Sequence, residues 1–281
     1  MSQKRVLQTT SRGLDHASPA MKLFHKAKEL GTWDPREIDL AQDGKDWAAL
    51  APLEREVVLH LTTLFQGGEE SVTLDLLPLI QVIAAEGRLE EELFLTSFLW
   101  EEAKHVEAFR RFLDEVATDA GDLERFLSPS WRALFEDELP RALGRLRTDP
   151  SPVAQAEASV TYNMIVEGVL AETGYRAYAA MLERNGILPG MQRIVALLTR
   201  DESRHIAYGV HLLTRLVAEN GDEVLTAIHR RMGELLPTAL AVVQDIFAAY
   251  DEMPFGLRLE EFVDIATGQF ASRLARIERG S

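Results

Sequence analysis

The chain has 281 residues, and 46% of them are hydrophobic, which is enough to bury a sizeable core in one large domain or two small ones. A formal net charge of −15 disfavours nucleic-acid binding, which needs Lys and Arg side chains to neutralise phosphates. The absence of cysteine excludes disulfides, thiolate metal sites and cysteine nucleophiles, and it fits a reducing cytoplasm.

The N-terminal residues are predicted to form an irregular arm over 1–35. They lack the apolar core of a secretory signal, and no apolar run approaches the roughly 20 residues that a membrane span needs. Helix signals dominate from there on, and no sustained two-residue alternation indicates a strand. Prolines at first helical positions and glycines after last turns delimit four predicted long helices: 52–84, 89–116, 152–184 and 189–220.

Shorter helical pieces are predicted for 122–147, and two further helices for 222–250, kinked at Pro237, and 257–276. No low-complexity linker divides this part of the chain. The sequence therefore predicts an all-α fold in which residues 36–281 form a single ferritin-like domain, a four-helix bundle with additional helices.

Two of the long helices carry a Glu-x-x-His motif, in LWEEAKH and again in TRDESRH. Glu102 and His105 fill a missing turn in the apolar stripe of the first of these helices. They are three residues apart, so they share the face that points into the core. Glu202 and His205 repeat the pattern in the second half of the chain.

The acids one position before the motif glutamates, Glu101 and Asp201, are predicted to swing off the stripe and face solvent. The other two long helices each place one acid on their buried stripe. These acids are Glu69 and Glu167, so the second half of the chain repeats the ligand pattern of the first.

A single Glu-x-x-His motif is usually a chance match or a surface pair, but four converging carboxylates are different. A buried unpaired ion costs several kcal/mol, and the four would raise one another's pKa. No Lys or Arg lies on these stripes, so two divalent metals are predicted to balance the charge. Oxygen and imidazole donors suit iron and manganese. The predicted ligands are Glu69, Glu102, His105, Glu167, Glu202 and His205.

Several neighbours of these ligands have two interpretations. Gly68, in a Gly-Gly pair before Glu69, either marks a local kink or leaves room for a ligand. Ala171 can leave space one turn after Glu167, and Tyr175 is either a core tyrosine or a hydrogen-bond donor near the site. Val72 lies three residues after Glu69 and therefore faces the site.

A redox-active metal pair with flexible carboxylates can reduce dioxygen, and a resemblance to known families points the same way. The ligand pattern and TWDPREIDL resemble the small-subunit superfamily of ribonucleotide reductase. That superfamily commonly has a radical tyrosine one turn after the first motif histidine, where this chain has Phe109. A radical-free manganese–iron subfamily also has phenylalanine at this position.

Residues 13–270 more closely resemble the ribonucleotide-reductase-small-subunit-like ligand-binding oxidases. The similarity is carried by GGEESVTLD, EGRLEEELFLTSFLWEEAKHVEAFR, DPSPVAQAEASVTYNMIVEGVLAETGY, ILPGMQ and DESRHIAYG. The resemblance implies one manganese and one iron per chain, although the same ligands can bind two irons. The manganese would match Glu69, Glu102 and His105, and the iron would match Glu167, Glu202 and His205.

The resemblance further implies a long-chain fatty acid or similar lipid whose carboxylate binds the metals. It also implies a homodimer, and an oxygen-dependent, two-electron C–H oxidation that joins Val72 Cβ to the oxygen of Tyr162. Spacing alone does not indicate this role for Tyr162, because it lies five residues before Glu167, about 140° round an ideal helix.

Two alternatives remain open at this stage. One is a ribonucleotide reductase small subunit, and the other is a ferroxidase or metal-storage bundle without an organic substrate. Val72, Tyr162 and the glycine pair favour the oxidase, because a ferroxidase bundle does not need them.

Overall fold

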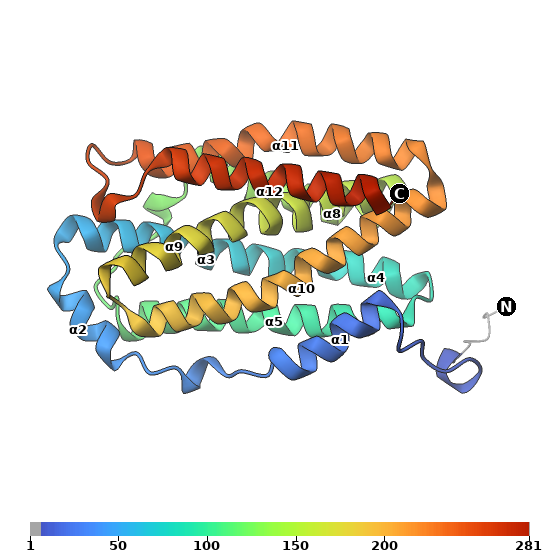
Figure 1. Ribbon diagram of the computed structural model, residues 1–281, viewed down its shortest axis with the longest axis horizontal. Helices are drawn as coiled ribbons and strands as arrows, with labels where there is room; N and C mark the ends of the chain where they lie inside the picture. Colours follow the sequence, from blue (N-terminus) through green and yellow to red (C-terminus); the bar gives the residue numbers. More distant parts are fainter. Residues whose placement is uncertain (1–6, 281) are drawn as a thin grey trace.

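The computed structural model describes residues 7–280, and within that range it contains helices and no strand. Figure 1 shows the long helices lying side by side along one axis, so that the molecule is an elongated bundle. The predicted all-α architecture is confirmed. Among the described residues, no helix combines the length and apolarity that a membrane crossing requires.

The α-helices follow one another along the chain, separated by short connections. They are α1 (Pro19–Leu30), α2 (Ala41–Ala49), α3 (Pro52–Asp75), α4 (Leu77–Ala85), α5 (Leu89–Glu115), α6 (Pro129–Arg132), α7 (Leu139–Arg145), α8 (Pro152–Ser159), α9 (Glu172–Asn185), α10 (Pro189–Asn220), α11 (Asp222–Ala248) and α12 (Leu259–Gly280). Two segments are π-helical, namely η4 (Ala133–Glu138) and η5 (Val160–Ala171). Short 3₁₀ turns are η1 (Gln8–Thr10), η2 (Pro35–Glu37), η3 (Glu124–Phe126) and η6 (Pro254–Gly256).

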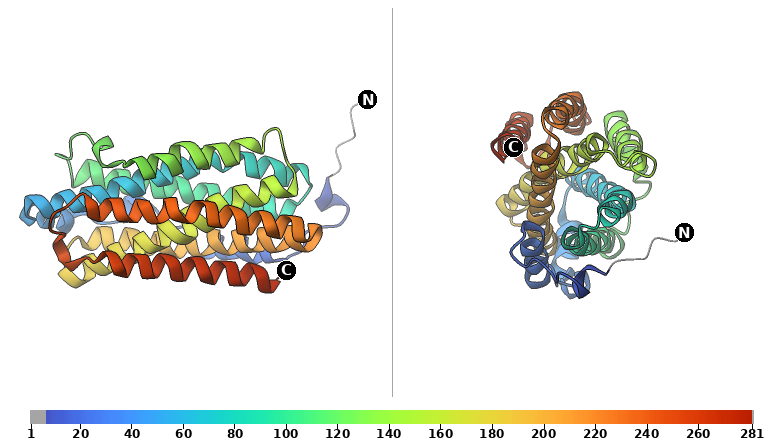
Figure 2. Two further views of the ribbon diagram at one scale, coloured as in Figure 1. Left: turned by 90° about the horizontal axis from the view of Figure 1, so that it is seen from above. Right: turned by 90° about the vertical axis from the view of Figure 1, so that its right-hand side faces the viewer.

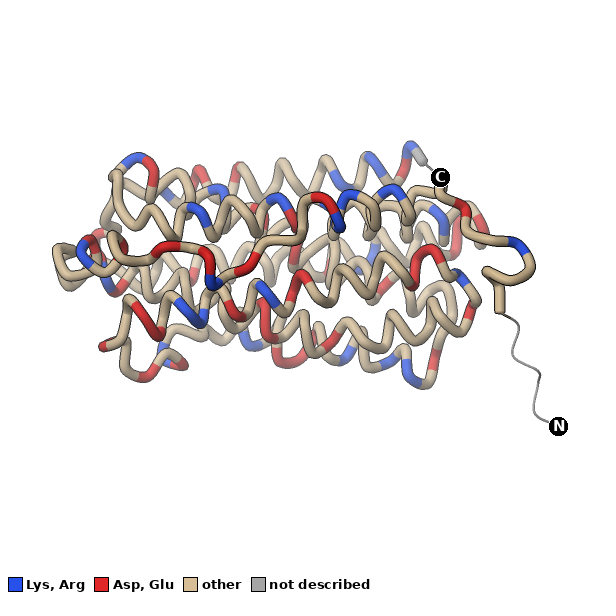
Figure 3. Tube along the Cα trace, turned by 90° about the horizontal axis from the view of Figure 1, so that it is seen from below, with Lys and Arg blue, Asp and Glu red and all other residues tan. Residues whose placement is uncertain are grey.

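The central bundle consists of α3, α5, α10 and the continuous helix α8–η5–α9. Helix α3 packs on α5, and α10 packs on both η5 and α9. Helices α11 and α12 cover the opposite side of η5, and the end-on view of Figure 2 shows this additional layer. Acidic and basic residues are interspersed along the helices, as Figure 3 shows.

Local signals set most helix ends where the sequence predicts them. Ser151 accepts a hydrogen bond from the Ala154 backbone N–H at 3.3 Å, which caps the helix that begins at Pro152. Gly186 takes a left-handed conformation with φ of 64° and ends α9, because a residue without Cβ adopts it at no steric cost. The predicted helices 89–116 and 189–220 match α5 and α10.

The prediction of an irregular arm over residues 1–35 is wrong for Pro19–Leu30, which form the helix α1. Ser18 caps this helix, and Ala20, Met21 and Ala27 are buried where it packs on α5 and α10. Its three lysines weaken the apolar stripe, so tertiary packing rather than periodicity stabilises it. Residues 1–6 of the predicted arm lie outside the described part of the chain.

Two of the predicted long helices are interrupted. The helix predicted over 52–84 divides at Leu76, because Pro78 has no backbone N–H to continue the hydrogen-bond ladder. The helix predicted over 152–184 is continuous, but residues 160–171 are π-helical rather than α-helical. This second difference determines which side chains reach the centre of the bundle.

Candidate metal centre

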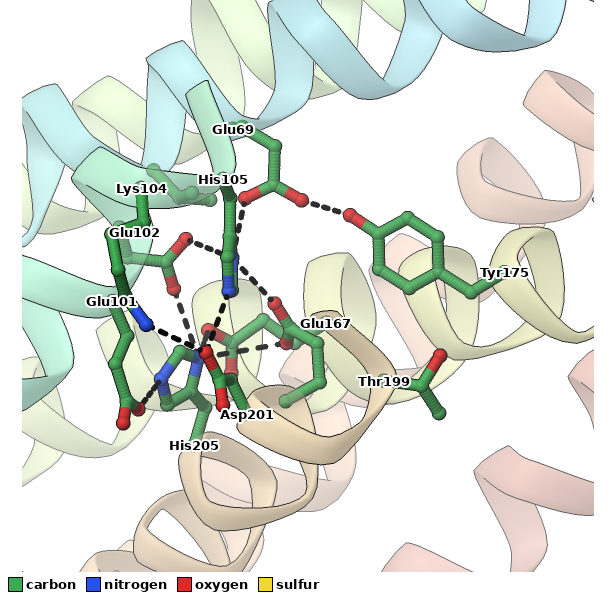
Figure 4. Close-up of polar contacts among 12 residues, drawn as sticks. Glu69, Glu101, Glu102, Lys104, His105, Glu167, Tyr175, Thr199, Asp201 and His205 are labelled. Carbon is green, nitrogen blue, oxygen red and sulfur yellow. Dashed lines mark hydrogen bonds and ion pairs between the residues drawn. The ribbon is translucent and has the colours of Figure 1, made fainter. Parts of the chain in front are cut away.

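The central helices bring together all six predicted metal ligands in the middle of the bundle. Each ligand is at most 5% exposed, so the group is shielded from solvent. Figure 4 shows the side chains converging from separate helices. The ligands are Glu69 on α3, Glu102 and His105 on α5, Glu167 on η5, and Glu202 and His205 on α10.

The potential donor atoms form two overlapping groups, and within each group they lie within 4.8 Å of one another. Both histidines turn Nδ1 towards the carboxylates. His105 Nδ1 is 3.3 Å from Glu69 Oε2, and His205 Nδ1 is 3.0 Å from Glu102 Oε1. Glu202 Oε1 lies 3.5 Å from His105 Nδ1, and its Oε2 lies 3.7 Å from His205 Nδ1. Glu102 and Glu202 therefore each lie near both histidines.

Several of these donor atoms are buried and have no hydrogen-bond partner among the described residues. They are Glu102 Oε2, Glu167 Oε1, Glu202 Oε2 and His205 Nδ1. Leaving such an atom unsatisfied costs about 1–3 kcal/mol, and more when it is charged. Two bound cations would satisfy all four, so the residues fit a dinuclear centre.

The protein environment shifts the pKa values of these groups. Burial raises the pKa of Glu69 to about 8 and that of Glu167 well above its usual range. Burial would lower the pKa of His105 and His205, but the carboxylates beside them raise both well above 6.5. Without metal, the centre therefore retains protons that bound cations would displace.

The prediction that Glu101 and Asp201 face solvent is wrong, because both are fully buried. Glu101 Oε2 lies 2.9 Å from His205 Nε2, and Asp201 Oδ2 lies 3.4 Å from His105 Nε2. Each acid thus contacts the histidine of the other helix and orients that imidazole. Helix α1 packs on α5 and α10, so the two acids are covered by the segment that was predicted to be irregular.

Two buried cations, which the sequence reasoning also missed, pair with these acids. Arg204 Nη2 lies 2.5 Å from Glu101 Oε1 and 2.6 Å from Asp201 Oδ1. Lys104 Nζ lies 3.1 Å from Asp201 Oδ2, and Trp33 donates to the same oxygen at 2.8 Å. Each cation directly precedes a motif histidine, which is the sequence signal that would have found both.

Tyr162 reaches the centre, although ideal helix geometry directs it elsewhere. Its hydroxyl lies 3.4 Å from Glu102 Oε1 and 3.4 Å from the carbonyl oxygen of Val72. The reason is the π-helical segment, whose i→i+5 hydrogen bonds bring Tyr162 and Glu167 onto nearly the same face. Asn163, on the same segment, donates to Glu167 Oε2 at 3.0 Å.

An apolar cavity of about 80 Å³ adjoins the carboxylates. The residues predicted to form a pocket, Gly68, Ala171 and Tyr175, all line it, as does Val72. A Cβ on Gly68 would meet Phe135 Cε1 at 3.4 Å, so the glycine allows close packing at the wall. Tyr175 is both a core residue and a hydrogen-bond donor, because its hydroxyl donates to Glu69 Oε1.

Comparison with known proteins supports the same assignment. The family described as ribonucleotide reductase, small chain, matches residues 16–264. The V72L variant of an R2-like ligand-binding oxidase, with an anaerobically reconstituted Mn/Fe cofactor, superposes with a TM-score of 0.93. It shares 36% sequence identity, and the match covers 99% of this chain and 100% of that one.

Two aerobically reconstituted Mn/Fe forms of that oxidase are equally similar. The V72I variant gives a TM-score of 0.94 at 36% identity, covering 98% of this chain and 100% of that chain. The Y162F variant gives a TM-score of 0.92 at 37% identity, and the match covers 99% of this chain and 100% of that chain. The resemblance inferred from the sequence is confirmed, and the chain is an oxygen-activating dinuclear metal oxidoreductase. It belongs to the ribonucleotide reductase small-chain family.

Proposed function

We propose that this protein is a manganese–iron oxidase that binds a long-chain fatty acid and uses dioxygen to join Val72 to Tyr162 through an ether. The Mn/Fe cofactor of the similar oxidases supports the metal assignment, because the ligand set here matches the one expected for it. A bound metal pair would supply dioxygen reduction and hence the oxidant.

The observation that carries the proposal is the position of the Tyr162 hydroxyl. It is fully buried, and it lies beside both the carboxylate of Glu102 and the backbone of Val72. Burial and the charge of Glu102 raise the pKa of this phenol well above 10. A buried tyrosine placed only for packing would not need a hydroxyl against this carboxylate.

The cross-link balances as a two-electron oxidation. The Val72 Cβ–H and Tyr162 O–H bonds break, and one Cβ–O bond forms. Two protons and two electrons are released, and dioxygen is the acceptor that is reduced. The role of the chain is to hold the two groups together and to exclude water, which the full burial of Tyr162 and the 4% exposure of Val72 achieve.

The apolar cavity supports the choice of a fatty acid as ligand. Its walls are almost entirely aliphatic and aromatic, with residues such as Leu61, Val242 and Phe262 away from the metal ligands. The carboxylates of the centre line only one part of it. A fatty acid could place its carboxylate at the metals and its alkyl chain against these walls.

Aerobic metal loading followed by intact-mass measurement tests the function. The protein loaded with manganese and iron in air should lose the mass of two hydrogen atoms, and digestion should give a Val72 peptide joined to a Tyr162 peptide. Anaerobic loading should leave the peptides separate. The Tyr162→Phe variant should bind its metals but form no joined peptide. Separate peptides in fully loaded, aerobic wild-type protein would overturn the proposal.

The fatty acid and the assembly need separate tests. Organic extraction followed by mass spectrometry should release a long-chain acid from the wild-type protein, and Gly68→Phe, which fills the cavity wall, should reduce its amount. We also propose a homodimer with a complete site in each chain, because one chain supplies all six ligands. A monomer at all concentrations in light scattering would contradict the dimer.

The family match leaves a ribonucleotide reductase small subunit as the second candidate. One position argues against a tyrosyl-radical version of it. Phe109 follows His105 by one turn, and its ring is fully buried between Phe65 and Tyr175, at centroid distances of 5.5 and 6.3 Å. That position therefore has no phenol to oxidise.

A further inference from the structure

Tyr208 is a fully buried tyrosine that the proposed cross-linking chemistry does not use. It lies on α10, three residues after His205, and its hydroxyl donates to Glu91 Oε2 at 3.0 Å. The other oxygen of Glu91 lies 3.2 Å from Arg215 Nε. The phenol is therefore hydrogen-bonded to a carboxylate, which can accept its proton over a short distance.

A series of aromatic rings connects Tyr208 with the metal centre. The Tyr208 and Phe94 centroids are 5.1 Å apart, and Phe94 and Phe98 are 6.0 Å apart. Phe98 lies 3.7 Å from the ring of His205 and 5.8 Å from Tyr162. All of these rings are fully buried. The series thus ends at a metal ligand and at the cross-linking tyrosine.

We propose that Tyr208 is a second electron donor to the centre, which supplies one electron when dioxygen has been activated and the Val72–Tyr162 cross-link cannot form. Tyr208 loses one electron, which passes along Phe94 and Phe98 to the centre at His205. Its O–H bond breaks, and the proton moves to Glu91 Oε2. The product is a neutral tyrosyl radical, and dioxygen is the oxidant that finally takes up the electron.

The environment of Tyr208 favours loss of the proton together with the electron. Burial and the charge of Glu91 raise the pKa of Tyr208 well above 10, so the phenol does not ionise on its own. The preformed hydrogen bond avoids the cost of leaving a protonated radical cation in an apolar core. The inference rests on the proposed function, because only an oxygen-activating centre supplies the oxidant.

Tyr178 provides a matched control within the same chain. It is also fully buried, and its ring lies 5.7 Å from Phe65, which lies 4.6 Å from Tyr175 beside the centre. Its hydroxyl, however, is 3.0 Å from the hydroxyl of Thr62 rather than from a carboxylate. Tyr178 is thus connected to the centre by rings but lacks a strong proton acceptor.

The test is freeze-quench electron paramagnetic resonance on protein loaded anaerobically with manganese(II) and iron(II) and then mixed with dioxygen. Wild-type protein should give little radical, because formation of the Val72–Tyr162 cross-link supplies the electrons. Tyr162→Phe should give a tyrosyl signal that narrows when tyrosine is deuterated on its β-carbon. Adding Tyr208→Phe or Glu91→Gln should abolish this signal, whereas adding Tyr178→Phe should leave it unchanged.

Oxygen uptake measured in the same samples distinguishes failure of the Tyr208 inference from failure of the proposed function. Loss of the signal in Tyr162→Phe/Tyr208→Phe, with oxygen uptake retained, supports Tyr208 as the donor. A signal that survives Tyr208→Phe, or its absence in Tyr162→Phe despite oxygen uptake, overturns the inference alone. No uptake by wild-type protein overturns the proposed function as well. Phe94→Leu keeps Tyr208 and Glu91 but interrupts the rings, so the radical should form more slowly.

Discussion

The two halves of the metal centre supply the same ligand types from helices of different geometry. The first half places Glu69 on the regular helix α3, and the second places Glu167 on the π-helical segment η5. On α3, Val72 follows the ligand by three residues. The π segment instead directs both Tyr162 and Asn163 at carboxylates of the centre. A change in helical hydrogen bonding thus adds a reactive side chain without changing the ligand set.

The buried cations behind the histidines also differ between the halves. Arg204 contacts both Glu101 and Asp201, whereas Lys104 contacts Asp201 and the carbonyl oxygen of Gly31. The planar guanidinium can join two acids, and the ammonium is a single compact charge. Each cation therefore makes one ion pair between α5 and α10, and Arg204 makes a second pair, with Asp201, within α10.

Removing a metal ligand should have the largest effect. The effect should differ between a residue that belongs to both groups of donor atoms and one that belongs to a single group. Glu102 belongs to both groups of donor atoms, so Glu102→Ala should lower the content of both metals. His205→Ala should mainly lower the metal bound with Glu167. Elemental analysis after loading measures both outcomes, with His60→Gln, a buried histidine outside the centre, as the control. Full metal content in both ligand variants would refute the site.

Removing a buried cation should cost less, and the cost should differ between the halves. Arg204→Met removes the one Lys or Arg partner that buried Glu101 has among the described residues, and should lower the free energy of unfolding by about 3–5 kcal/mol. Lys104→Met should cost less, because Arg204 still pairs with Asp201. Urea denaturation measures the difference. Arg110→Met, which breaks an exposed pair with Asp114, should change stability by less than about 1 kcal/mol. Equal losses in the free energy of unfolding for Lys104→Met and Arg204→Met would contradict the expected difference between the two cations.

A glycine substitution can disturb the π-helical half selectively. A Cβ on Gly209 would lie 2.3 Å from Asn163 Cβ, so Gly209→Ala must displace the segment that carries Tyr162. We expect a loss of about 1–3 kcal/mol and a lower yield of the joined peptide. Gly233→Ala, with no heavy atom within 4 Å of the added Cβ, should not destabilise the protein. An unchanged cross-link yield in Gly209→Ala would show that the segment tolerates displacement.

A buried histidine away from the centre gives the smallest expected effect. Burial lowers the pKa of His60 to about 4, whereas the carboxylates raise that of His105. As the pH falls, His60 is protonated in the unfolded chain before it is protonated in the folded protein. The contribution of neutral His60 to the free energy of unfolding is therefore complete above about pH 6.5 and is lost as the pH falls towards 4. Wild-type protein should lose about 1–2 kcal/mol more than His60→Gln between pH 7 and pH 5. Parallel denaturation profiles for the two metal-loaded proteins would contradict this assignment.

The sequence predicts those features that depend on local signals. Proline at the start of a helix and glycine after its end are visible in the sequence, so α5 and α10 lie where they are predicted. Five of the six ligands interrupt apolar stripes on α3, α5 and α10, and this pattern survives in the bundle because these helices are regular around their ligands, whereas Glu167 lies on the π-helical segment.

Other features depend on tertiary structure, and the sequence could not provide them. The burial of Glu101 and Asp201 results from α1, which packs across α5 and α10 and has a weak periodic pattern of its own. Tyr162 was indicated only by the family resemblance. An ideal helix turns it away from Glu167, and nothing in the local sequence announces a π-helical segment.

The crossed contacts behind the histidines link the two metal positions energetically. Glu101 comes from α5 but orients His205 of α10, and Asp201 comes from α10 but orients His105 of α5. A shift of either helix that adjusts one imidazole therefore moves the support of the other. We therefore expect occupancy of one position to change the affinity of the second, and by thermodynamic reciprocity the second should change the first equally. Filling of the centre should then be cooperative rather than two independent binding events.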